Sequence, residues 1–177
     1  MITLNEFDLL ARLEEKASSA TYHFSKEGAA TYWTGVKFHL NNEILVVDSR
    51  EISEILLVPD TVPLPNVKTW VQGVANIRGS VIPIFDLGVF LGGSEEYALE
   101  RRRVMLVEKK NIIFGLVVDD VLGVVQFPSL SSEESILGSL PPIMRPFISG
   151  CCYKDISYMV FSTDQLVENQ RFISVSE

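Results

Sequence analysis

Cysteine and histidine are scarce in this chain, and no long apolar segment is present. The two cysteines, Cys151 and Cys152, are adjacent, and adjacent cysteines bridge only with strain, so a disulfide framework is excluded. The two histidines, His23 and His39, have no partner at metal-ligand spacing. We therefore expect no metal site and no histidine-based catalytic centre. The longest clean apolar stretch, 112–118, has the length of one strand and is too short to cross a bilayer.

Positive charge is also in short supply. The chain has 15 lysines and arginines against 23 aspartates and glutamates, a formal net charge of −8, and an isoelectric point near 4.8. Nucleic-acid-binding proteins normally present a basic surface, so this class is disfavoured, as is attachment to anionic membranes. The N-terminus, 1–16, lacks the basic start and apolar centre of a secretory signal. Together with the low cysteine content, this favours a cytoplasmic protein.

Hydrophobic residues make up 47% of the sequence, which is enough for a sizeable core. The first segment, 3–18, has helical spacing of its apolar residues and a capping box formed by Thr3 and Glu6, so it is predicted to be a helix. A connector is expected over 19–34. The apolar stripe of the helix either packs back on the protein or contacts a partner, and the sequence leaves both open.

From residue 36 onward, alternating or continuous apolar runs separated by turn residues predict short strands. The order strand, polar turn, strand, acidic residue and apolar run occurs twice, around 36–58 and around 103–125, which indicates two similar small β lobes. The expected strands are 36–40, 44–47, 73–77, 80–85, 104–107, 112–118, 121–127, 147–153 and 156–161, with a further apolar run at 52–58.

Short helices are expected in two further places. Asp86 can cap a helix that the pair Gly92-Gly93 ends. Ser162 and Gln165 form a capping box that opens a helix in the C-terminal segment 162–177.

Clustered charges and the cysteine pair are interpreted as structural. Asp119 and Asp120 are neighbours on a strand and face opposite sides, so they cannot act as an acid–base pair and are interpreted as solvated charges. The arginine run 101–103 is interpreted as a solubilising strand entrance, with a partner contact as the alternative. Of Cys151 and Cys152, one is expected to face the core and the other to face outward.

The segment 71–87 places polar residues among two apolar strands. Gly73 permits close approach of another backbone, and Arg78-Gly79 makes the turn between the strands. Asn76 and Arg78 are therefore held on rigid strands near an apolar surface, where a guanidinium needs a carboxylate partner.

Three motifs resemble those of the CheW-like coupling proteins of bacterial chemosensory systems. Residues 73–87 are similar to Gly-Val-x-Asn-Leu-Arg-Gly followed by a proline-containing strand and Asp-Leu, with Ile77 in place of the common leucine. The Glu54-Ile55 pair stands at the family's spacing after the second strand. Residues 115–121 are similar to Gly-hydrophobic-Val-Val-Asp-x-Val. The resemblance covers about 36–161, most of the chain.

This resemblance implies a mainly β fold of two intertwined five-stranded, SH3-like β-barrel subdomains, with an N-terminal and a C-terminal helix. The N-terminal helix and connector would cover 1–35, the CheW-like domain 36–161, and the C-terminal helix and tail 162–177. The two barrels would correspond to about 36–93 and 103–161, with some strand exchange. No catalysis and no cofactor are implied.

The resemblance also implies partners. Such adaptors join the cytoplasmic tip of a methyl-accepting chemoreceptor to the regulatory domain of a CheA-type histidine kinase, in cytoplasmic arrays at the membrane. They neither insert into the membrane nor bind nucleic acid, and self-association stays open. Residues 68–76 and 90–92 are similar to the branch of type IV pilus (twitching motility) systems. The residues that match the receptor-contact region are Ile52, Glu54, Gly73, Asn76 and Arg78, with an ion pair expected between Glu54 and Arg78.

Two alternatives remain at this stage. A coupling protein of flagellar chemotaxis would carry the same three motifs. A small-molecule-binding β-barrel, or an enzyme built on one, would need polar or catalytic groups that the sequence does not offer in a recognisable pattern.

Overall fold

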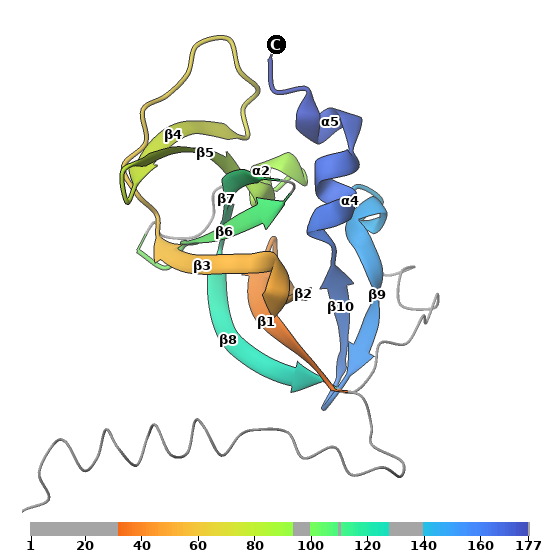
Figure 1. Ribbon diagram of the computed structural model, residues 1–177. Helices are drawn as coiled ribbons and strands as arrows, with labels where there is room; N and C mark the ends of the chain where they lie inside the picture. Colours follow the sequence, from red (N-terminus) through yellow and green to blue (C-terminus); the bar gives the residue numbers. More distant parts are fainter. Residues whose placement is uncertain (1–31, 94–99, 110, 128–139, 177) are drawn as a thin grey trace, which may run out of the picture. The chain divides into compact units, whose positions relative to one another are not determined.

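The computed structural model describes residues 32–93, 100–109, 111–127 and 140–176 (Figure 1). The predicted N-terminal helix at 3–18 lies outside these residues, as does most of the predicted connector. The chain divides into two units, and the second, Thr31–Glu177, contains all of the described residues. Within them, no helix has the length and apolar character needed to cross a membrane.

The described strands form two five-stranded sheets, which confirms the predicted mainly β class. Sheet A has the strand order β8-β1-β2-β10-β9, and sheet B has the order β3-β6-β7-β5-β4. The strands are β1 (Trp33–Leu40), β2 (Glu43–Asp48), β3 (Ile52–Leu57), β4 (Val71–Ile77), β5 (Ser80–Asp86), β6 (Arg103–Lys109), β7 (Ile112–Val118), β8 (Asp120–Phe127), β9 (Ile148–Tyr153) and β10 (Ser157–Phe161). The helices are η1 (Ser49–Glu51), α2 (Leu87–Phe90), η2 (Arg145–Phe147), α4 (Thr163–Glu168) and α5 (Gln170–Ile173).

Each sheet combines strands from distant parts of the chain. In sheet A, β1 and β2 form a hairpin, and β2 also pairs in parallel with β10. In sheet B, β5 pairs in parallel with β7. The chain passes from sheet A to sheet B after β2 and returns after β7, where β8 curves away from sheet B (Figure 1). Both sheets therefore contain residues from 36–93 and from 103–161.

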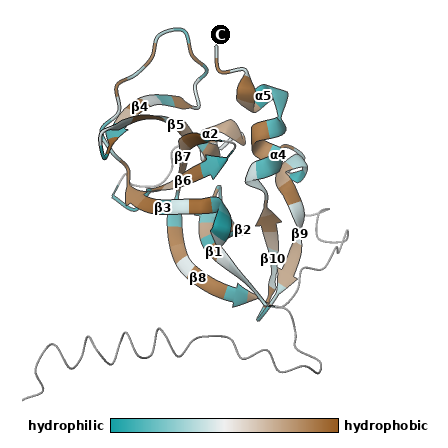
Figure 2. Cartoon of the chain, viewed as in Figure 1, coloured by the Kyte–Doolittle hydropathy of each residue, from teal (hydrophilic) through white to brown (hydrophobic). Residues whose placement is uncertain are grey.

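Several strands carry apolar residues along much of their length (Figure 2), and three apolar clusters account for them. In β2, Leu45 and Val47 belong to a central core, whereas Val46 belongs to a second cluster, core A. In β6, Met105 faces the central core and Val104 faces a third cluster, core B. Because successive side chains of a strand point to opposite faces, each sheet has its own core on one face and shares the central core on the other.

The expected closed barrels are not present in the hydrogen-bonded ladders. Among the described strands, β8 and β9 terminate sheet A, and β3 and β4 terminate sheet B, without pairing to each other. Register shifts bend the sheets, for example between Val71 and Gly73 and between Ile52 and Glu54. The curved sheets enclose cores A and B with side chains, so the ring of backbone hydrogen bonds that would define a closed barrel is not needed.

The helix caps follow the sequence patterns. The side chain of Asp86 caps α2 and that of Ser162 caps α4, as predicted. The C-terminal helix consists of two short helices, because Asn169 leaves helical geometry and caps α5. Buried Leu166 and Phe172 attach α4 and α5 to the central core.

Both cysteines are buried, so the prediction that one faces outward is wrong. Cys151 lies opposite Met159 and Cys152 opposite Tyr158 in the β9–β10 ladder. Met159 belongs to the central core and Tyr158 to core A, so both faces of β9 are covered. Burial raises the pKa of the Cys152 thiol to about 12, which makes it inert as a nucleophile at neutral pH.

Candidate partner-binding site

The tip of the β4–β5 hairpin presents two of the predicted site residues. Arg78 and Gly79 form its two-residue turn and have φ angles of 52° and 84°. Positive φ at both positions is typical of a type I′ turn, whose twist matches that of the flanking strands. The side-chain oxygen of Asn76 accepts a hydrogen bond from the Gly79 N–H at 3.0 Å. This bond braces the turn from which Arg78 projects.

The predicted ion pair between Glu54 and Arg78 is present. The guanidinium donates to the Glu54 carboxylate at 2.6 Å. Glu54 lies on β3 and Arg78 follows β4, so the pair joins the two terminal strands of sheet B. The Arg78 side chain is 77% exposed, and an exposed pair contributes at most about 1 kcal/mol to stability. Its main effect is to link the two edge strands of sheet B and to hold a cation at the surface.

Gly73 makes the close backbone approach that the sequence predicts. Its φ is +126°, and a Cβ at this position would lie 2.2 Å from the Val62 carbonyl oxygen. Val62 and Val74 exchange two backbone hydrogen bonds of 2.8 and 3.0 Å. Gly73 therefore pins the segment between β3 and β4 onto the edge of sheet B.

Ile52 differs from the other predicted residues because it packs against the central core. It lies opposite Val107. Because of the register shift after Ile52, Glu54 lies opposite Leu106, which belongs to core B. The structure thus brings Glu54, on one edge strand of sheet B, into contact with Arg78 beside the other edge strand, where Asn76 also lies. It places Ile52 partly inside the protein.

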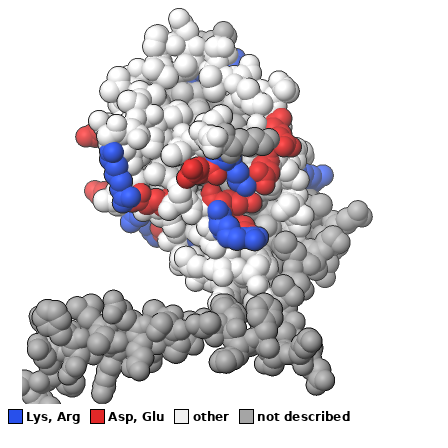
Figure 3. Space-filling model, viewed as in Figure 1, with Lys and Arg blue, Asp and Glu red and all other residues white. Residues whose placement is uncertain are grey.

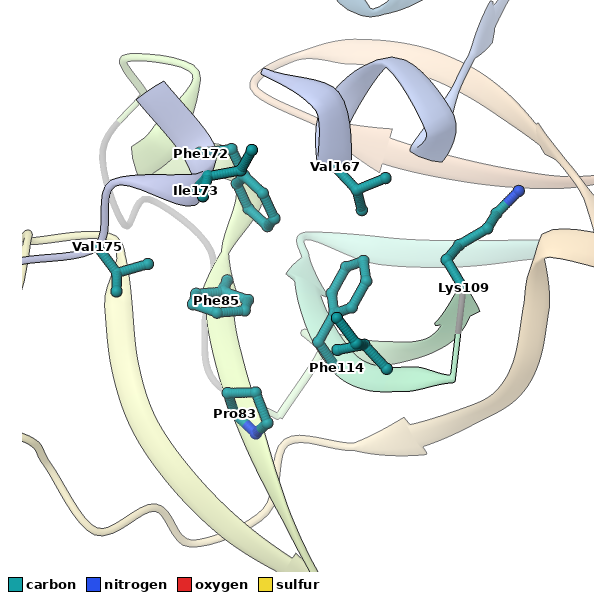
Figure 4. Close-up of a pocket in the computed structure, with 9 residues that line it drawn as sticks. Pro83, Phe85, Lys109, Phe114, Val167, Phe172, Ile173 and Val175 are labelled. Atoms are coloured by element: carbon teal, nitrogen blue, oxygen red, sulfur yellow. The ribbon is translucent and has the colours of Figure 1, made fainter. Parts of the chain in front are cut away.

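An apolar groove of about 250 Å³ lies between sheet B and the C-terminal helices (Figure 4). None of the five predicted residues lines it. The groove is formed by β5, the facing ends of β6 and β7, the helices α4 and α5, and the tail after α5. Its lining residues are Pro83, Phe85, Lys109, Ile112, Phe114, Val167, Phe172, Ile173 and Val175.

Three aromatic rings form the floor of the apolar groove. The ring centroid of Phe85 lies 6.1 Å from that of Phe114 and 5.1 Å from that of Phe172. Phe114 and Phe172 are 5.9 Å apart. The mouth is flanked by Ile112 and Ile173, which are 62% and 53% exposed. Packed rings give a rigid floor, and the exposed isoleucines offer surface that a partner can cover.

Charge is confined to the rim. Lys109 Nζ lies 3.0 Å from an oxygen of Asp164 and 3.8 Å from an oxygen of Glu51. Glu51 also accepts hydrogen bonds from the N–H and hydroxyl of Thr163, the first residue of α4. In the view of Figure 3, acidic and basic side chains lie close together across the middle of the described surface. At the rim, two carboxylates surround one ammonium, so an incoming cation would be favoured over an incoming anion.

The hairpin and the apolar groove share one face of sheet B. Asn76 lies directly opposite Val81 in the antiparallel ladder, and opposite residues point to the same side. Val81 is 72% exposed and precedes the groove residue Pro83 by two positions, so it points to the same side as Pro83. Exposed apolar surface therefore continues from the groove toward Asn76. Among the described residues, no group of three metal-ligating side chains is found.

Arg102 forms a buried ion pair, so the interpretation of the run 101–103 as a solubilising strand entrance is wrong for this residue. Arg102 is 3% exposed, and its guanidinium donates to the carboxylate of Asp86, which is also buried. Gln72 donates to the same Asp86 oxygen at 3.1 Å. Arg101 fits the original interpretation, since it is 67% exposed and lies 3.6 Å from Asp120.

Asp119 is buried, so its interpretation as a solvated charge is wrong. It is 4% exposed and accepts a hydrogen bond from the Asn41 N–H at 2.7 Å. Burial raises the pKa of its carboxyl above the ordinary value, and the nearby Asp86 charge acts in the same direction. The Asn41 hydrogen bond and the charge of Arg102 oppose this rise.

The raised pKa of Asp119 predicts a pH dependence of stability. The folded protein binds the proton of the Asp119 carboxyl more tightly than the unfolded chain does. The stability that this proton contributes is therefore fully present below the pKa of the unfolded chain, and it is lost as pH rises through the pKa of the folded protein. We expect Asp119→Asn, which cannot titrate, to gain stability relative to the parent across that interval. Urea unfolding of both proteins at a series of pH values measures this. A difference that is constant with pH would contradict it.

Over the described residues, the fold is a module of two five-stranded β sheets with an apolar groove beside the C-terminal helices. Residues 34–171 match the CheW-like domain, and the chain belongs to this family. It is 34% identical to protein PilI of Pseudomonas aeruginosa over 174 residues, which cover 96% of each chain. It is 30% identical to the chemotaxis protein CheW of Thermotoga maritima over 91 residues, 51% of this chain and 60% of that protein.

A solved structure supports the fold. The scaffolding protein TtCheW of Thermoanaerobacter tengcongensis superposes with a TM-score of 0.64 at 23% identity, covering 75% of this chain and 90% of that one. The family predicted from the three motifs is thus confirmed. CheW-like scaffolding proteins are non-catalytic, and the chain is a CheW-like adaptor of chemotactic signal transduction.

Proposed function

We propose that this chain couples a chemoreceptor to a CheA-type histidine kinase in a chemosensory system that controls type IV pili. The observation that carries the proposal is the similarity to PilI along 96% of both chains. The similarity to the CheW of Thermotoga maritima covers only 51% of this chain. The proposed partners are the cytoplasmic tip of the receptor and the regulatory domain of the kinase.

The apolar groove is proposed to receive a helix of the receptor tip. An amphipathic helix presents apolar side chains at intervals of three and four residues, and such helices dock in preformed apolar grooves. The aromatic floor provides the pocket for an anchor side chain. The carboxylates of Glu51 and Asp164 at the rim favour a helix with lysine or arginine beside that anchor.

The β4–β5 hairpin is proposed as the polar part of the same contact. Asn76 lies on the groove side of sheet B, and Arg78 holds an exposed cation beside it. Glu54 fixes Arg78 in position, and Gly73 keeps the edge of the sheet closely packed. Ile52 would support this surface from the core side.

Two isoleucines of nearly equal exposure test the groove. Ile173 lines the groove and is 53% exposed, whereas Ile156 precedes β10 outside the groove and is 54% exposed. We expect Ile173→Asp to weaken binding of the purified receptor tip by about tenfold or more, because it places a charge at an apolar anchor site. Ile156→Asp is the control and should leave binding unchanged. Equal affinities for both variants would reject the groove as the receptor site.

A charge reversal tests the hairpin. Arg78→Glu should weaken receptor binding while changing the free energy of unfolding by no more than about 1 kcal/mol, because the pair is exposed. The double variant Glu54→Arg, Arg78→Glu rebuilds the pair with reversed charges. If the shape of the edge is what the receptor contacts, the double variant recovers binding. Unchanged binding of Arg78→Glu would show that Arg78 is not a contact residue.

The pathway is tested in the source bacterium. Deletion of the gene should abolish twitching and leave swimming intact, and receptor control of kinase activity should require the protein in a reconstituted mixture. Loss of swimming with normal twitching would favour flagellar chemotaxis instead.

A further inference from the structure

The side chain of Asn41 joins the β1–β2 turn of sheet A to α2. Asn41 Nδ2 donates a hydrogen bond to the Gly88 carbonyl oxygen at 3.0 Å, within α2. Its backbone N–H donates to Asp119 at 2.7 Å. Space for the side chain is provided by Gly93, where a Cβ would lie 2.0 Å from Asn41 Oδ1. The turn is therefore inserted against α2.

The two asparagines of this turn differ in their surroundings. Asn41 and Asn42 both have positive φ, 49° and 68°, as a type I′ turn requires. The Asn41 side chain is partly buried against α2, whereas Asn42 is exposed. Positive φ favours asparagine or glycine at both positions of the turn, but the turn geometry does not require the contact of Asn41 with Gly88.

The other end of α2 supports a wall of the apolar groove. The Phe90 ring packs edge-on against Phe172, with centroids 5.3 Å apart. The Arg171 guanidinium lies 4.6 Å from the Phe90 ring centroid and donates to the Phe90 carbonyl oxygen at 2.5 Å. Trp70 packs edge-on against Phe90 at 5.3 Å. Because Phe172 lines the groove, α2 helps to hold α5 at that wall, together with Phe85 and Phe114 of sheet B.

We propose that Asn41 is a positioning residue for the apolar groove. By holding Gly88 it fixes α2, and through Phe90 it fixes Phe172 and α5 at the groove. The apolar contacts of Phe90 are non-directional, whereas the amide–carbonyl bond of Asn41 sets a direction and a distance. The part of this proposal that concerns partner binding rests on the proposed function, and the part that concerns α2 and α5 does not.

The experiment compares Asn41→Gly with Asn42→Gly. Both changes keep a residue that tolerates positive φ, and only the first removes the bond to Gly88. We expect amide hydrogen exchange in 87–93 and 170–173 to become about five- to tenfold faster in Asn41→Gly, as for the loss of one hydrogen bond. Asn42→Gly should exchange there as the parent does. Faster exchange confined to the β1–β2 turn would overturn the proposal.

A second variant and a second readout keep the test independent of the turn. Gly93→Ala leaves the turn sequence intact but displaces the Asn41 side chain, so it should reproduce the exchange pattern of Asn41→Gly. The chain has 2 tryptophans, so a Trp33→Phe background leaves Trp70 as the fluorescent reporter. The fluorescence emission of Trp70 should shift to the red in both Asn41→Gly and Gly93→Ala. Unchanged emission and exchange in Gly93→Ala would overturn the proposal.

Receptor binding completes the comparison. Asn41→Gly should bind the receptor tip several-fold more weakly than Asn42→Gly, because the groove wall is less well positioned. If the unaltered protein does not bind the tip, the proposed function fails, and the exchange and emission results still decide the positioning role. If the tip binds both variants equally while exchange differs, the role of Asn41 at the binding site is rejected.

Discussion

Replacing Arg102 with alanine is expected to lower the free energy of unfolding by about 3–5 kcal/mol, the usual result of breaking one side of a buried ion pair. The Arg102 side chain is 4% exposed and the Asp86 side chain 1% exposed. The guanidinium also acts on the buried carboxyl of Asp119. Alanine would leave both carboxylates in a poorly solvated site without this cation, and Asp86 would still be needed as the cap of α2.

Arg101→Ala is the matched control for Arg102→Ala. Arg101 is adjacent and 67% exposed, and it lies 3.6 Å from Asp120, so its loss should cost less than about 1 kcal/mol. Urea unfolding followed by tryptophan fluorescence measures both variants. If Arg102→Ala does not fold, Arg102→Lys keeps a positive charge with fewer donors and should give an intermediate loss. Equal losses for Arg101→Ala and Arg102→Ala would contradict the assignment of a buried pair.

Strands such as β1 could be predicted because apolar side chains that face a core alternate along them with more polar side chains. In β1, Val36, Phe38 and Leu40 are buried and the intervening Lys37 and His39 are half-buried. The continuous apolar runs were also strands, since cores on both sides cover them. The helix caps and the Arg78-Gly79 turn could be predicted for a similar reason, because their hydrogen bonds join residues close in sequence.

The burial of individual charges could not be predicted from neighbours in the sequence. Arg101 and Arg102 are identical residues in a run of three, and only the second pairs with Asp86, the last residue of β5. Asp119 is buried because the β1–β2 turn lies against it, whereas Asp120 faces Arg101 at the surface. In each case the deciding contact joins residues far apart along the chain.

The apolar groove was missed for the same reason. The motif residues that indicated the family lie mainly on the β4–β5 hairpin, where local sequence fixes their geometry. The groove forms only when Phe172 and Ile173, near the C-terminus, pack against Phe85 and Phe114 of sheet B. The helices α4 and α5 are too short for the spacing of their apolar residues to show which strands they pack against. The packing of these helices on sheet B therefore depends on the tertiary fold.

The second large effect is expected at Gly73. An alanine there would adopt a φ of +126°, which side chains rarely occupy, at a cost of about 1–3 kcal/mol. Its Cβ would also lie 2.2 Å from the carbonyl oxygen of Val62, and moving that backbone should add about 1–3 kcal/mol. The hydrogen bonds between Val62 and Val74 would lengthen, so the segment before β4 should detach from the sheet edge.

Gly79→Ala separates strain from crowding in this prediction. Gly79 also has positive φ, +84°, but a Cβ there meets nothing within 4 Å, so only a left-handed penalty of about 1–2 kcal/mol is expected. Urea unfolding should therefore show a larger loss for Gly73→Ala, and amide exchange at Val62 and Val74 should accelerate in that variant alone. If both alanines cost the same and both amides stay protected, the backbone of Val62 is not held against Gly73. The edge of sheet B beside Asn76 and Arg78 would then depend on the hairpin turn and the Glu54 ion pair alone.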